Sequence, residues 1–265
     1  MNDLDEKHEK LQTVLARTGG ALVAYSAGVD STLLLHAASR VLGERVMAAT
    51  VATPYVPQRE LDEAERFITA SGIKHIVISL PFPEELRLNP PDHCYTCKKL
   101  LFGKMIETAQ EYGFLHVLDG TNTDDLGDYR PGLKALRELE IISPFVEAGL
   151  TKAEIRELSR RAGLPTWNKP SFACLLSRMP VDTPVNDHDL RQVEEAENLL
   201  SDLGFPAVRV RHHGEIARIE VPKDRITEFA EANELHGIDA ALKKIGYHFV
   251  TLDLGGYSMG SLNRK

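Results

Sequence analysis

Four apolar runs recur in the first half of the chain and constrain its fold more than any other feature. They lie at residues 21–25, 45–51, 75–80 and 114–119. In each run the apolar residues follow one another instead of alternating with polar ones, as is typical of strands that are covered on both faces. Amphipathic stretches separate them, at residues 30–42, 58–71 and 97–112. This alternation predicts an α/β fold with a parallel, doubly wound sheet.

A helix is expected at residues 151–162, where Thr151 and Glu154 have the spacing of a capping box. The sequence pattern changes after this helix. Residues 165–184 are rich in proline and have no helical period. An acidic amphipathic helix, a hairpin, two more helical stretches and a strand are expected beyond them, at residues 186–203, 207–221, 224–232, 238–244 and 248–254. We expect a first domain over residues 1–184 and a smaller α+β domain over residues 185–265.

Charge and composition exclude several classes of protein. The 265 residues include 31 Lys and Arg against 39 Asp and Glu, a net charge of −8, which argues against a nucleic-acid partner. No apolar run approaches the roughly 20 residues of a membrane span, and the N-terminus is too polar for a signal peptide. The three cysteines are too few for a disulfide scaffold. We expect a cytoplasmic enzyme that acts on a small molecule.

Residues 25–32, Tyr-Ser-Ala-Gly-Val-Asp-Ser-Thr, lie between a predicted strand and a predicted helix. A helix N-terminus offers free N–H groups and the positive end of a dipole, and both favour phosphate. Gly28 allows close approach of the backbone, while Asp30 is a candidate for holding Mg²⁺ or positioning a nucleotide. No Walker lysine is present, so γ-phosphate transfer is not expected. The alternative is a plain helix cap without a ligand. The hydroxyl donors of this loop are Ser26, Ser31 and Thr32.

A second polar segment, Asp119-Gly-Thr-Asn-Thr-Asp-Asp125, also follows a predicted strand. A glycine at the end of a strand permits a tight turn, and the paired carboxylates Asp124 and Asp125 can share a cation. Arg130, a few residues later, can pair with a phosphate or with an anionic substrate. The alternative is a solvated turn.

Cys94 and Cys97 form a CxxC motif at the start of a predicted helix, and Cys174 lies in the proline-rich segment. Three thiolates can ligate three irons of a 4Fe-4S cluster and leave the fourth iron open to an added ligand. Alternatives are zinc with His93 or His116 as a fourth ligand, a redox dithiol, or ordinary buried thiols.

Arg209 and Arg211 alternate with valines on a predicted strand, so both guanidinium groups face the same side, together with His213. Such a pair suits recognition of a phosphate. The alternative is an exposed strand with solvated arginines. Glu197 and Glu220 either line the same region or are ordinary surface acids.

The motifs together resemble a known family. SAGVDST resembles the SGGxDS loop of the ATP-pyrophosphatase (PP-loop) superfamily, with Ala27 in place of the first glycine, and GTNTDD resembles its GTNxDD segment. Over nearly the whole chain the sequence resembles the LarE family, the ATP-dependent sulfur transferases that make the nickel-pincer nucleotide of lactate racemase. The other matching segments are TPYVP at 53–57, DHCYTCK at 92–98, NKPSFACLLSR at 168–178 and RVRHHGEIARIE at 209–220.

The resemblance implies a PP-loop, HUP-like first domain and a second domain for substrate binding and assembly. Some members give up the sulfur of a single cysteine, whereas others carry three cysteines and a 4Fe-4S cluster; this chain resembles the cluster type. In this family ATP adenylates a carboxylate of a pyridinium biscarboxylate mononucleotide, and sulfur then displaces AMP to leave a thiocarboxylate. The resemblance also implies ATP and Mg²⁺ as cofactors, sulfide or a cysteine desulfurase as the sulfur source, and a trimer or hexamer.

The site residues that this resemblance implies fall into three groups. The nucleotide group is Ser26, Gly28, Asp30 (with Mg²⁺), Ser31, Thr32, Thr53, Gly120, Asp125 and Arg130. The substrate-phosphate group is Ser177, Arg209 and Arg211, and the sulfur-transfer group is Cys94, Cys97 and Cys174. Other functions compatible with the motifs are a tRNA thiolase, an amidotransferase of the same superfamily, and a metal-binding scaffold that uses ATP only as a conformational ligand.

Overall fold

The computed structural model describes residues 3–127, 131–170 and 173–257. The chain divides into two compact units. The first comprises Met1–Pro81 and Asp92–Phe172, and the second comprises Phe82–Pro91 and Ala173–Lys265. The smaller unit therefore begins earlier than the expected boundary at residue 185, and it includes a segment from the middle of the first half of the chain.

Asn89 explains why the segment Phe82–Pro91 belongs with the second unit. This residue is buried, and its side-chain amide donates toward the carbonyl oxygens of Leu176, Met179 and Pro180 at 3.2, 3.1 and 3.0 Å. The backbone adds a bond from Val185 N to Arg87 O of 2.7 Å. Contacts between residues almost ninety positions apart are tertiary, so no local pattern predicts them.

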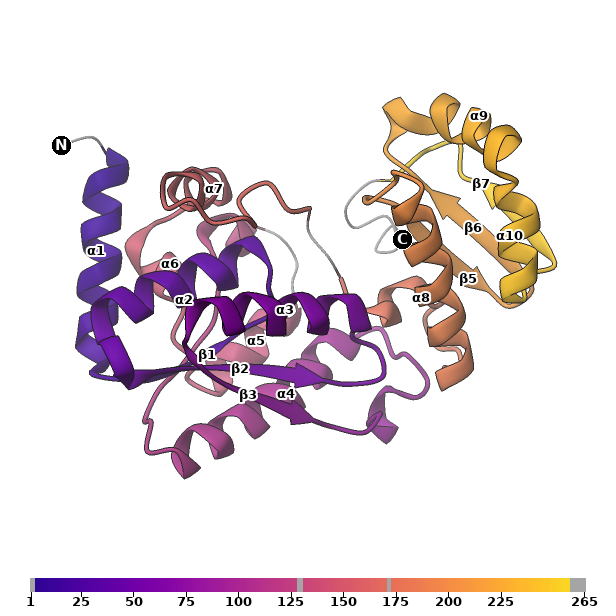
Figure 1. The fold of residues 1–265 in the computed structure, drawn as a ribbon. Coiled ribbons are helices and arrows are strands. Elements are labelled where there is room, and N and C mark those ends of the chain that lie inside the picture. Colours follow the sequence, from indigo (N-terminus) through magenta and orange to yellow (C-terminus); the bar gives the residue numbers. More distant parts are fainter. Residues whose placement is uncertain (1–2, 128–130, 171–172, 258–265) are drawn as a thin grey trace. The chain divides into compact units, whose positions relative to one another are not determined.

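The first unit contains a four-stranded parallel sheet in the order β3-β2-β1-β4 (Figure 1). The strands are β1 Ala21–Ala24, β2 Val46–Ala52, β3 Lys74–Ser79 and β4 Val117–Leu118. All four coincide with the predicted apolar runs, so the predicted parallel α/β fold is confirmed. Parallel neighbours require crossover connections, and helices provide them here.

Strands β1, β2 and β4 of this sheet are buried on both faces, which is why they are continuously apolar, whereas the edge strand β3 has Val77 half exposed. In β1, Ala21 and Val23 belong to one hydrophobic cluster and Leu22 belongs to another. The first cluster includes residues of α1, α2 and α3, and the second includes residues of α4. The helices of the unit are α1 Asp3–Thr18, α2 Val29–Leu42, α3 Gln58–Ser71, α4 His93–Glu111, α5 Pro131–Glu138, α6 Pro144–Ala148 and α7 Lys152–Arg161.

Helix α7 begins as its sequence predicts. The side chain of Thr151 accepts a hydrogen bond from Glu154 N, and the Glu154 carboxylate accepts one from Thr151 N at 2.8 Å. Both halves of the capping box are therefore present, and two otherwise unpaired N–H groups of the first turn are satisfied.

The second unit contains a three-stranded sheet in the order β5-β6-β7 (Figure 1). Strands β5 Arg209–His213 and β6 Ile216–Glu220 form the predicted antiparallel hairpin, with Gly214 in its turn at φ 62°, and β7 Phe249–Leu252 pairs with β6 in parallel. The hairpin register places Arg209 opposite Glu220. The unit also contains α8 Asp187–Asp202, α9 Ile226–His236 and α10 Ile238–Ile245, together with the short 3-10 helices η2 Glu84–Leu86, η4 Leu175–Arg178 and η5 Lys223–Arg225.

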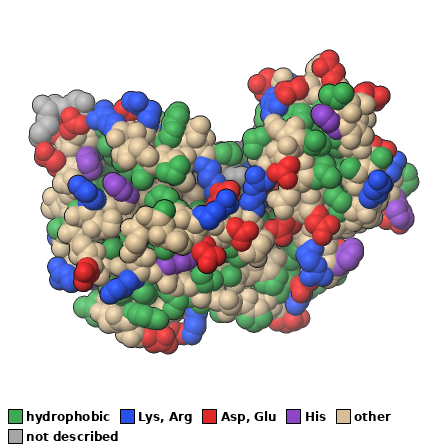
Figure 2. Space-filling view, in the orientation of Figure 1, with side chains coloured by type: hydrophobic (Ala, Val, Ile, Leu, Met, Phe, Trp, Pro, Cys, Tyr) green, Lys and Arg blue, Asp and Glu red, His purple; other side chains and the backbone are tan. Residues whose placement is uncertain are grey.

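No helix among the described residues has the length and hydropathy that crossing a bilayer requires. Figure 2 shows Lys and Arg side chains interspersed with Asp and Glu over the displayed face.

Candidate functional site

The predicted phosphate loop connects β1 to α2 in the first unit. Gly28 is the N-cap residue of α2 and has no side chain that could cap the helix. The first helical hydrogen bond runs from Thr32 N to Gly28 O at 3.0 Å. The hydroxyl of Ser31 lies 3.2 Å from both the backbone N and the hydroxyl of Ser26, and this pair closes the loop on itself. The N-terminus of α2 thus keeps the donors and the dipole end that an anion requires.

Ala27 adopts φ +54°, a backbone conformation that L-residues with a side chain rarely take. This is the position at which the resembling loop motif has glycine. The loop geometry therefore explains the glycine of the motif, and here an alanine, the smallest residue with a Cβ, adopts the same left-handed conformation.

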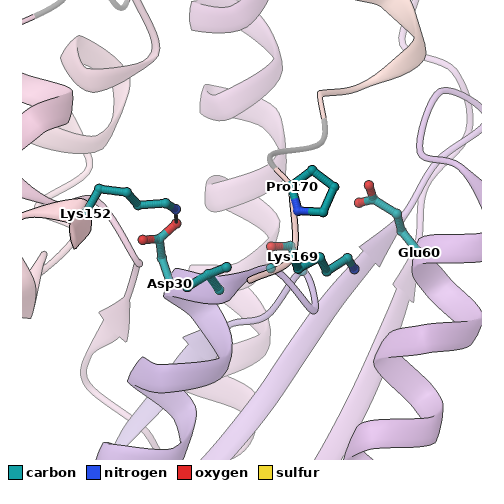
Figure 3. Close-up of a pocket in the computed structure, with 8 residues that line it drawn as sticks. Asp30, Glu60, Lys152, Lys169 and Pro170 are labelled. Carbon is teal, nitrogen blue, oxygen red and sulfur yellow. Dashed lines mark hydrogen bonds and ion pairs between the residues drawn. The ribbon is translucent and has the colours of Figure 1, made fainter. Parts of the chain in front are cut away.

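A cavity of about 130 Å³ opens at this loop, within the first unit. Figure 3 shows the Lys152 ammonium directed at the Asp30 carboxylate, with which it forms an ion pair. The lining includes two basic and two acidic side chains, so a bound anion would meet both signs of charge. The lining residues are Ser26, Gly28, Val29, Asp30, Glu60, Lys152, Lys169 and Pro170.

The second predicted segment packs directly against the start of α2. A Cβ built on Gly120 would lie 2.9 Å from the Cβ of Asp30, so this position leaves no room for a side chain. Asn122 donates from its side chain to Asp30 at 3.5 Å. Lys152 N donates to Asp124 at 2.9 Å, and Asn122 N donates to Asp125 at 3.0 Å. The two signature segments therefore meet, and the paired carboxylates organise the loop and the start of α7.

Asp119 at the end of β4 holds this loop in place through hydrogen bonds. Its side chain is buried and accepts hydrogen bonds from Ser143, at 2.5 Å, and from Thr121. Burial raises the pKa of the Asp119 carboxyl, while the two hydroxyl donors act in the opposite direction. The residue joins the loop to the N-terminus of α6.

The buried hydroxyl of Thr53 at the end of β2 has no hydrogen-bond partner among the described residues. The buried hydroxyl of Thr32 in the first turn of α2 interacts with the Tyr25 hydroxyl of the same loop. Buried polar groups are usually paired, so an unpaired hydroxyl indicates a place for a ligand atom or a water molecule. Both residues were predicted to bind nucleotide. Arg130, also predicted there, lies outside the described residues.

The cysteines are divided between the two units, and none is in a disulfide. Cys94 and Cys97 lie one turn apart near the start of α4; Cys94 is exposed and Cys97 is half-buried, with the Tyr55 hydroxyl 3.4 Å from its Sγ. Desolvation raises the pKa of the Cys94 thiol, and the Lys98 ammonium opposes the rise. Among the described residues no three His, Cys, Asp or Glu side chains form a group that could hold a metal ion.

Cys174 is the N-cap residue of η4 in the second unit, where a buried arginine fixes its backbone. The Arg178 guanidinium pairs with both carboxylate oxygens of Glu197 at 2.9 and 2.8 Å. It also donates to the Cys174 carbonyl at 3.2 Å and to the Ser177 hydroxyl at 2.8 Å. Burial lowers the pKa of Arg178, but the Glu197 carboxylate outweighs burial and the pKa is raised. Glu197 is therefore an ion-pair partner in the interior of this unit.

The two arginines of β5 are also buried, contrary to the alternative of an exposed strand. Arg211 pairs with Glu220 at 2.7 Å and donates to the Ser177 carbonyl at 2.7 Å, so it joins the hairpin to η4. The Arg209 guanidinium lies 4.9 Å from the centre of the Tyr257 ring. Burial and the nearby Arg178 charge lower the pKa of Arg209, while the Glu197 carboxylate acts in the opposite direction. This group of buried arginines around Ser177 can accept an anion.

Comparison with known proteins identifies the family. No family model matches the chain. The pyridinium-3,5-bisthiocarboxylic acid mononucleotide synthase of Lactiplantibacillus plantarum is 36% identical over 266 residues, covering 99% of this chain and 96% of that protein. The chain belongs to the family of this synthase. An uncharacterised protein of Synechocystis is 38% identical over 264 residues, covering 98% of each.

A partial likeness extends to a second kind of enzyme. One of the subunits of the glutamine-hydrolysing GMP synthase of Thermoplasma acidophilum is 30% identical over 173 residues, covering 57% of this chain and 54% of that protein. The family and this likeness support an ATP-using enzyme of the PP-loop superfamily.

Three side chains that organise these sites were not predicted. Lys152 and Lys169 line the cavity, and Arg178 holds the backbone of Cys174. Lys152 directly follows Thr151, the N-cap residue of α7, and its place at a predicted helix start could have indicated that it lies near the other polar loops. Lys169 and Arg178 lie in the segment NKPSFACLLSR that carries the family resemblance, but no helical or strand period there indicated which of its side chains are buried.

Proposed function

We propose that this protein is an ATP-dependent sulfur transferase that converts a carboxylate of a pyridinium biscarboxylate mononucleotide into a thiocarboxylate. One observation carries the proposal. The chain matches the bisthiocarboxylic acid mononucleotide synthase from end to end, and its phosphate loop retains an uncapped helix N-terminus beside an organised carboxylate segment.

The reaction needs ATP because oxide is a poor leaving group from a carboxylate. A substrate carboxylate oxygen attacks the α-phosphorus, pyrophosphate leaves, and an acyl adenylate forms. Sulfur then attacks the acyl carbon and AMP leaves with the original carboxylate oxygen, so one oxygen is exchanged for one sulfur.

The nucleotide would occupy the cavity at the phosphate loop. The N-terminus of α2 and the hydroxyls of Ser26, Ser31 and Thr32 would bind its phosphates, and the unpaired Thr53 hydroxyl would bind another of its polar atoms. The donor set also fits Mg²⁺, which prefers carboxylate oxygens, because Asp30 presents a carboxylate into this cavity. Its pairing with Lys152 keeps the carboxylate neutralised until a cation binds.

The substrate phosphate would bind to the buried arginine group of the second unit. Arg209 and Arg211 lie on β5, and Arg211 already contacts η4 through the Ser177 carbonyl. Buried guanidinium groups bind phosphate more strongly than exposed ones, since little water competes. The second unit would thus supply substrate binding and, in a trimer or hexamer, subunit contacts.

The cysteines offer the thiolate sulfurs that a 4Fe-4S cluster takes as ligands, two from the first unit and one from the second. None of the three is in a disulfide, and Cys94 and Cys97 lie one turn apart near the N-terminus of α4, whose dipole opposes the desolvation that raises the pKa of the Cys94 thiol. When bound, such a cluster supplies the transferable sulfur, which sulfide or a cysteine desulfurase would restore. Arg178 would hold the Cys174 backbone in place. We place this chemistry in the cytoplasm, with no nucleic-acid partner.

Oxygen labelling tests the proposal. With a substrate labelled with ¹⁸O in its carboxylates, mass spectrometry should find one labelled oxygen in AMP for each thiocarboxylate formed. Unlabelled AMP, or hydrolysis of ATP that does not depend on the substrate, would exclude the adenylation chemistry.

Cysteine variants separate adenylation from sulfur transfer. Cys94→Ala and Cys97→Ala should abolish repeated sulfur transfer while substrate-dependent pyrophosphate release remains, because the thiols act after adenylation. Loss of both activities together would indicate a structural role for these cysteines. Iron and acid-labile sulfide in anaerobically purified protein give an independent measure of the cluster, and stoichiometric zinc without sulfide would contradict it.

A further inference from the structure

A second cation reaches the phosphate loop from the segment that follows α7. The Lys169 ammonium lies 3.1 Å from the carbonyl oxygen of Ala27 and 2.5 Å from the carboxylate of Glu63 on α3. Its side chain is only 13% exposed. We propose that Lys169 binds the phosphates that leave as pyrophosphate, exchanging Glu63 for the nucleotide, and that Arg156 is its positioning residue. The inference rests on the nucleotide site proposed above.

The charges around the cavity favour this role. The loop has no Walker lysine, and the lining includes the carboxylates of Asp30 and Glu60, which repel a polyphosphate. Lys152 forms an ion pair with Asp30 and Lys169 forms one with Glu63, so each ammonium has a carboxylate partner before the nucleotide enters. Negative charge grows on the departing pyrophosphate, and fixed cations beside it stabilise the transition state.

A lysine is suited to such an exchange of partners. Its ammonium is a compact charge on a flexible stem, and it can bind one anion and then another without a change in the backbone. Because Lys169 already contacts the carbonyl of Ala27, it needs only a side-chain rotation to meet a phosphate in the loop.

Arg156 fixes the backbone from which Lys169 extends. Its two terminal nitrogens donate to the carbonyl oxygens of Trp167 and Lys169 at 2.7 and 2.9 Å. A planar guanidinium that holds two carbonyls of one short segment restricts both its position and its orientation. Arg156 lies on α7 one turn after Lys152, so the same helix carries one cation of the cavity and positions the other.

Nucleotide titrations test the role of Lys169. Calorimetry on the full-length protein with Mg²⁺ and the non-cleavable analogue α,β-methylene-ATP should show about ten- to hundredfold weaker binding for Lys169→Met, the range expected for one charge-assisted hydrogen bond. AMP affinity should change less than twofold, and Lys169→Arg should retain most of the binding. Lys104→Met, which removes a lysine paired with Glu107 on the surface of α4, is the matched control and should bind like the wild type.

Glu63→Gln should change the affinity for the analogue in the opposite direction, and this test does not depend on the stability of the lysine variant. Removing the competing carboxylate should strengthen binding of the analogue several-fold. Equal losses for the analogue and AMP in Lys169→Met, unchanged binding in that variant, or weaker binding in Glu63→Gln would each overturn the inference.

A double-mutant cycle tests Arg156. Arg156→Ala should weaken binding of the analogue about as much as Lys169→Met, and the combined variant should be little worse than either one, because both changes remove the same contact. Arg156→Lys should rescue only part of the affinity, since an ammonium cannot hold both carbonyls at once. Additive losses would leave Arg156 with a structural role only. If the wild type binds no nucleotide, the proposed function fails; if it binds and Lys169→Met binds equally, this inference alone fails.

Discussion

Replacing Arg178 by methionine should lower the free energy of unfolding of the second unit substantially. The Arg178 side chain is fully buried and its partner Glu197 is 13% exposed. Methionine fills much of the same space without charge, so the Glu197 carboxylate would stay in the interior without its counter-charge. The hydrogen bonds of Arg178 to the carbonyls of Ala173 and Cys174, at 2.8 and 3.2 Å, would be lost as well.

Breaking a buried ion pair by removing one partner costs about 3–5 kcal/mol of the free energy of unfolding. With a fall of about 2–4 °C for each kcal/mol in a protein of this size, the midpoint of thermal unfolding should drop by about 6–20 °C. The matched control is Arg160→Met. Arg160 makes the same two-pronged contact with Glu157, at 2.8 and 2.9 Å, but its side chain is 56% exposed. An exposed pair contributes about 0–1 kcal/mol.

Urea unfolding followed by circular dichroism measures both variants. The double variant Arg178→Met, Glu197→Gln should recover part of the loss, because glutamine removes the stranded charge and keeps the oxygen that accepts from Val210 N at 2.9 Å. A cost below about 1 kcal/mol for Arg178→Met, or a double variant no more stable than the single one, would refute the reasoning from buried charge.

Three further predictions concern the first unit. Gly120→Ala should cost about 1–3 kcal/mol of unfolding free energy and weaken nucleotide binding, because its Cβ would meet that of Asp30 at 2.9 Å, whereas Gly127→Ala has open space and should be silent in urea unfolding. Burial raises the pKa of the Asp119 carboxyl in the folded protein. The contribution of this group to the free energy of unfolding is therefore fully present below the usual carboxyl pKa and is lost as pH rises through the raised one. Because Asp119→Asn removes this titration, the unfolding free energy of the variant relative to that of the wild type should rise across this pH window, and parallel curves would contradict the prediction. Thr151→Ala should cost about 1 kcal/mol through loss of the capping box, and Thr151→Ser should restore it in the same assay.

Local patterns predicted the elements that position the site. The continuous apolar runs predicted the four parallel strands; in β1, β2 and β4 nearly every residue is apolar because both faces of these strands are buried. The helix α1 was not predicted, although its buried Leu11, Val14 and Leu15 have helical spacing. The many charged residues around these three make the segment strongly polar and obscure the helical period.

The parts of the site that the sequence did not predict depend on contacts between distant residues. Lys169 and Glu63 are 106 positions apart, and Arg178 and Glu197 are 19 apart. A lysine or arginine in an aperiodic loop looks the same whether it faces solvent or a buried carboxylate. Glu197 and Glu220 were left open between a surface position and the interior for this reason, and the structure places Glu220 in the interior, paired with Arg211.

The parallel sheet, the glycine-containing loop between β1 and α2 and the hairpin that turns at Gly214 depend on the hydrophobic spacing and turn residues of short stretches of sequence. The sequence by itself therefore determined these three features. Only the tertiary structure decided which charges are buried and paired, and which segments join each unit. The physical reason is that backbone preferences act over a few residues, whereas the pairing of a buried charge depends on whatever side chain the folded chain brings within about 3 Å of it.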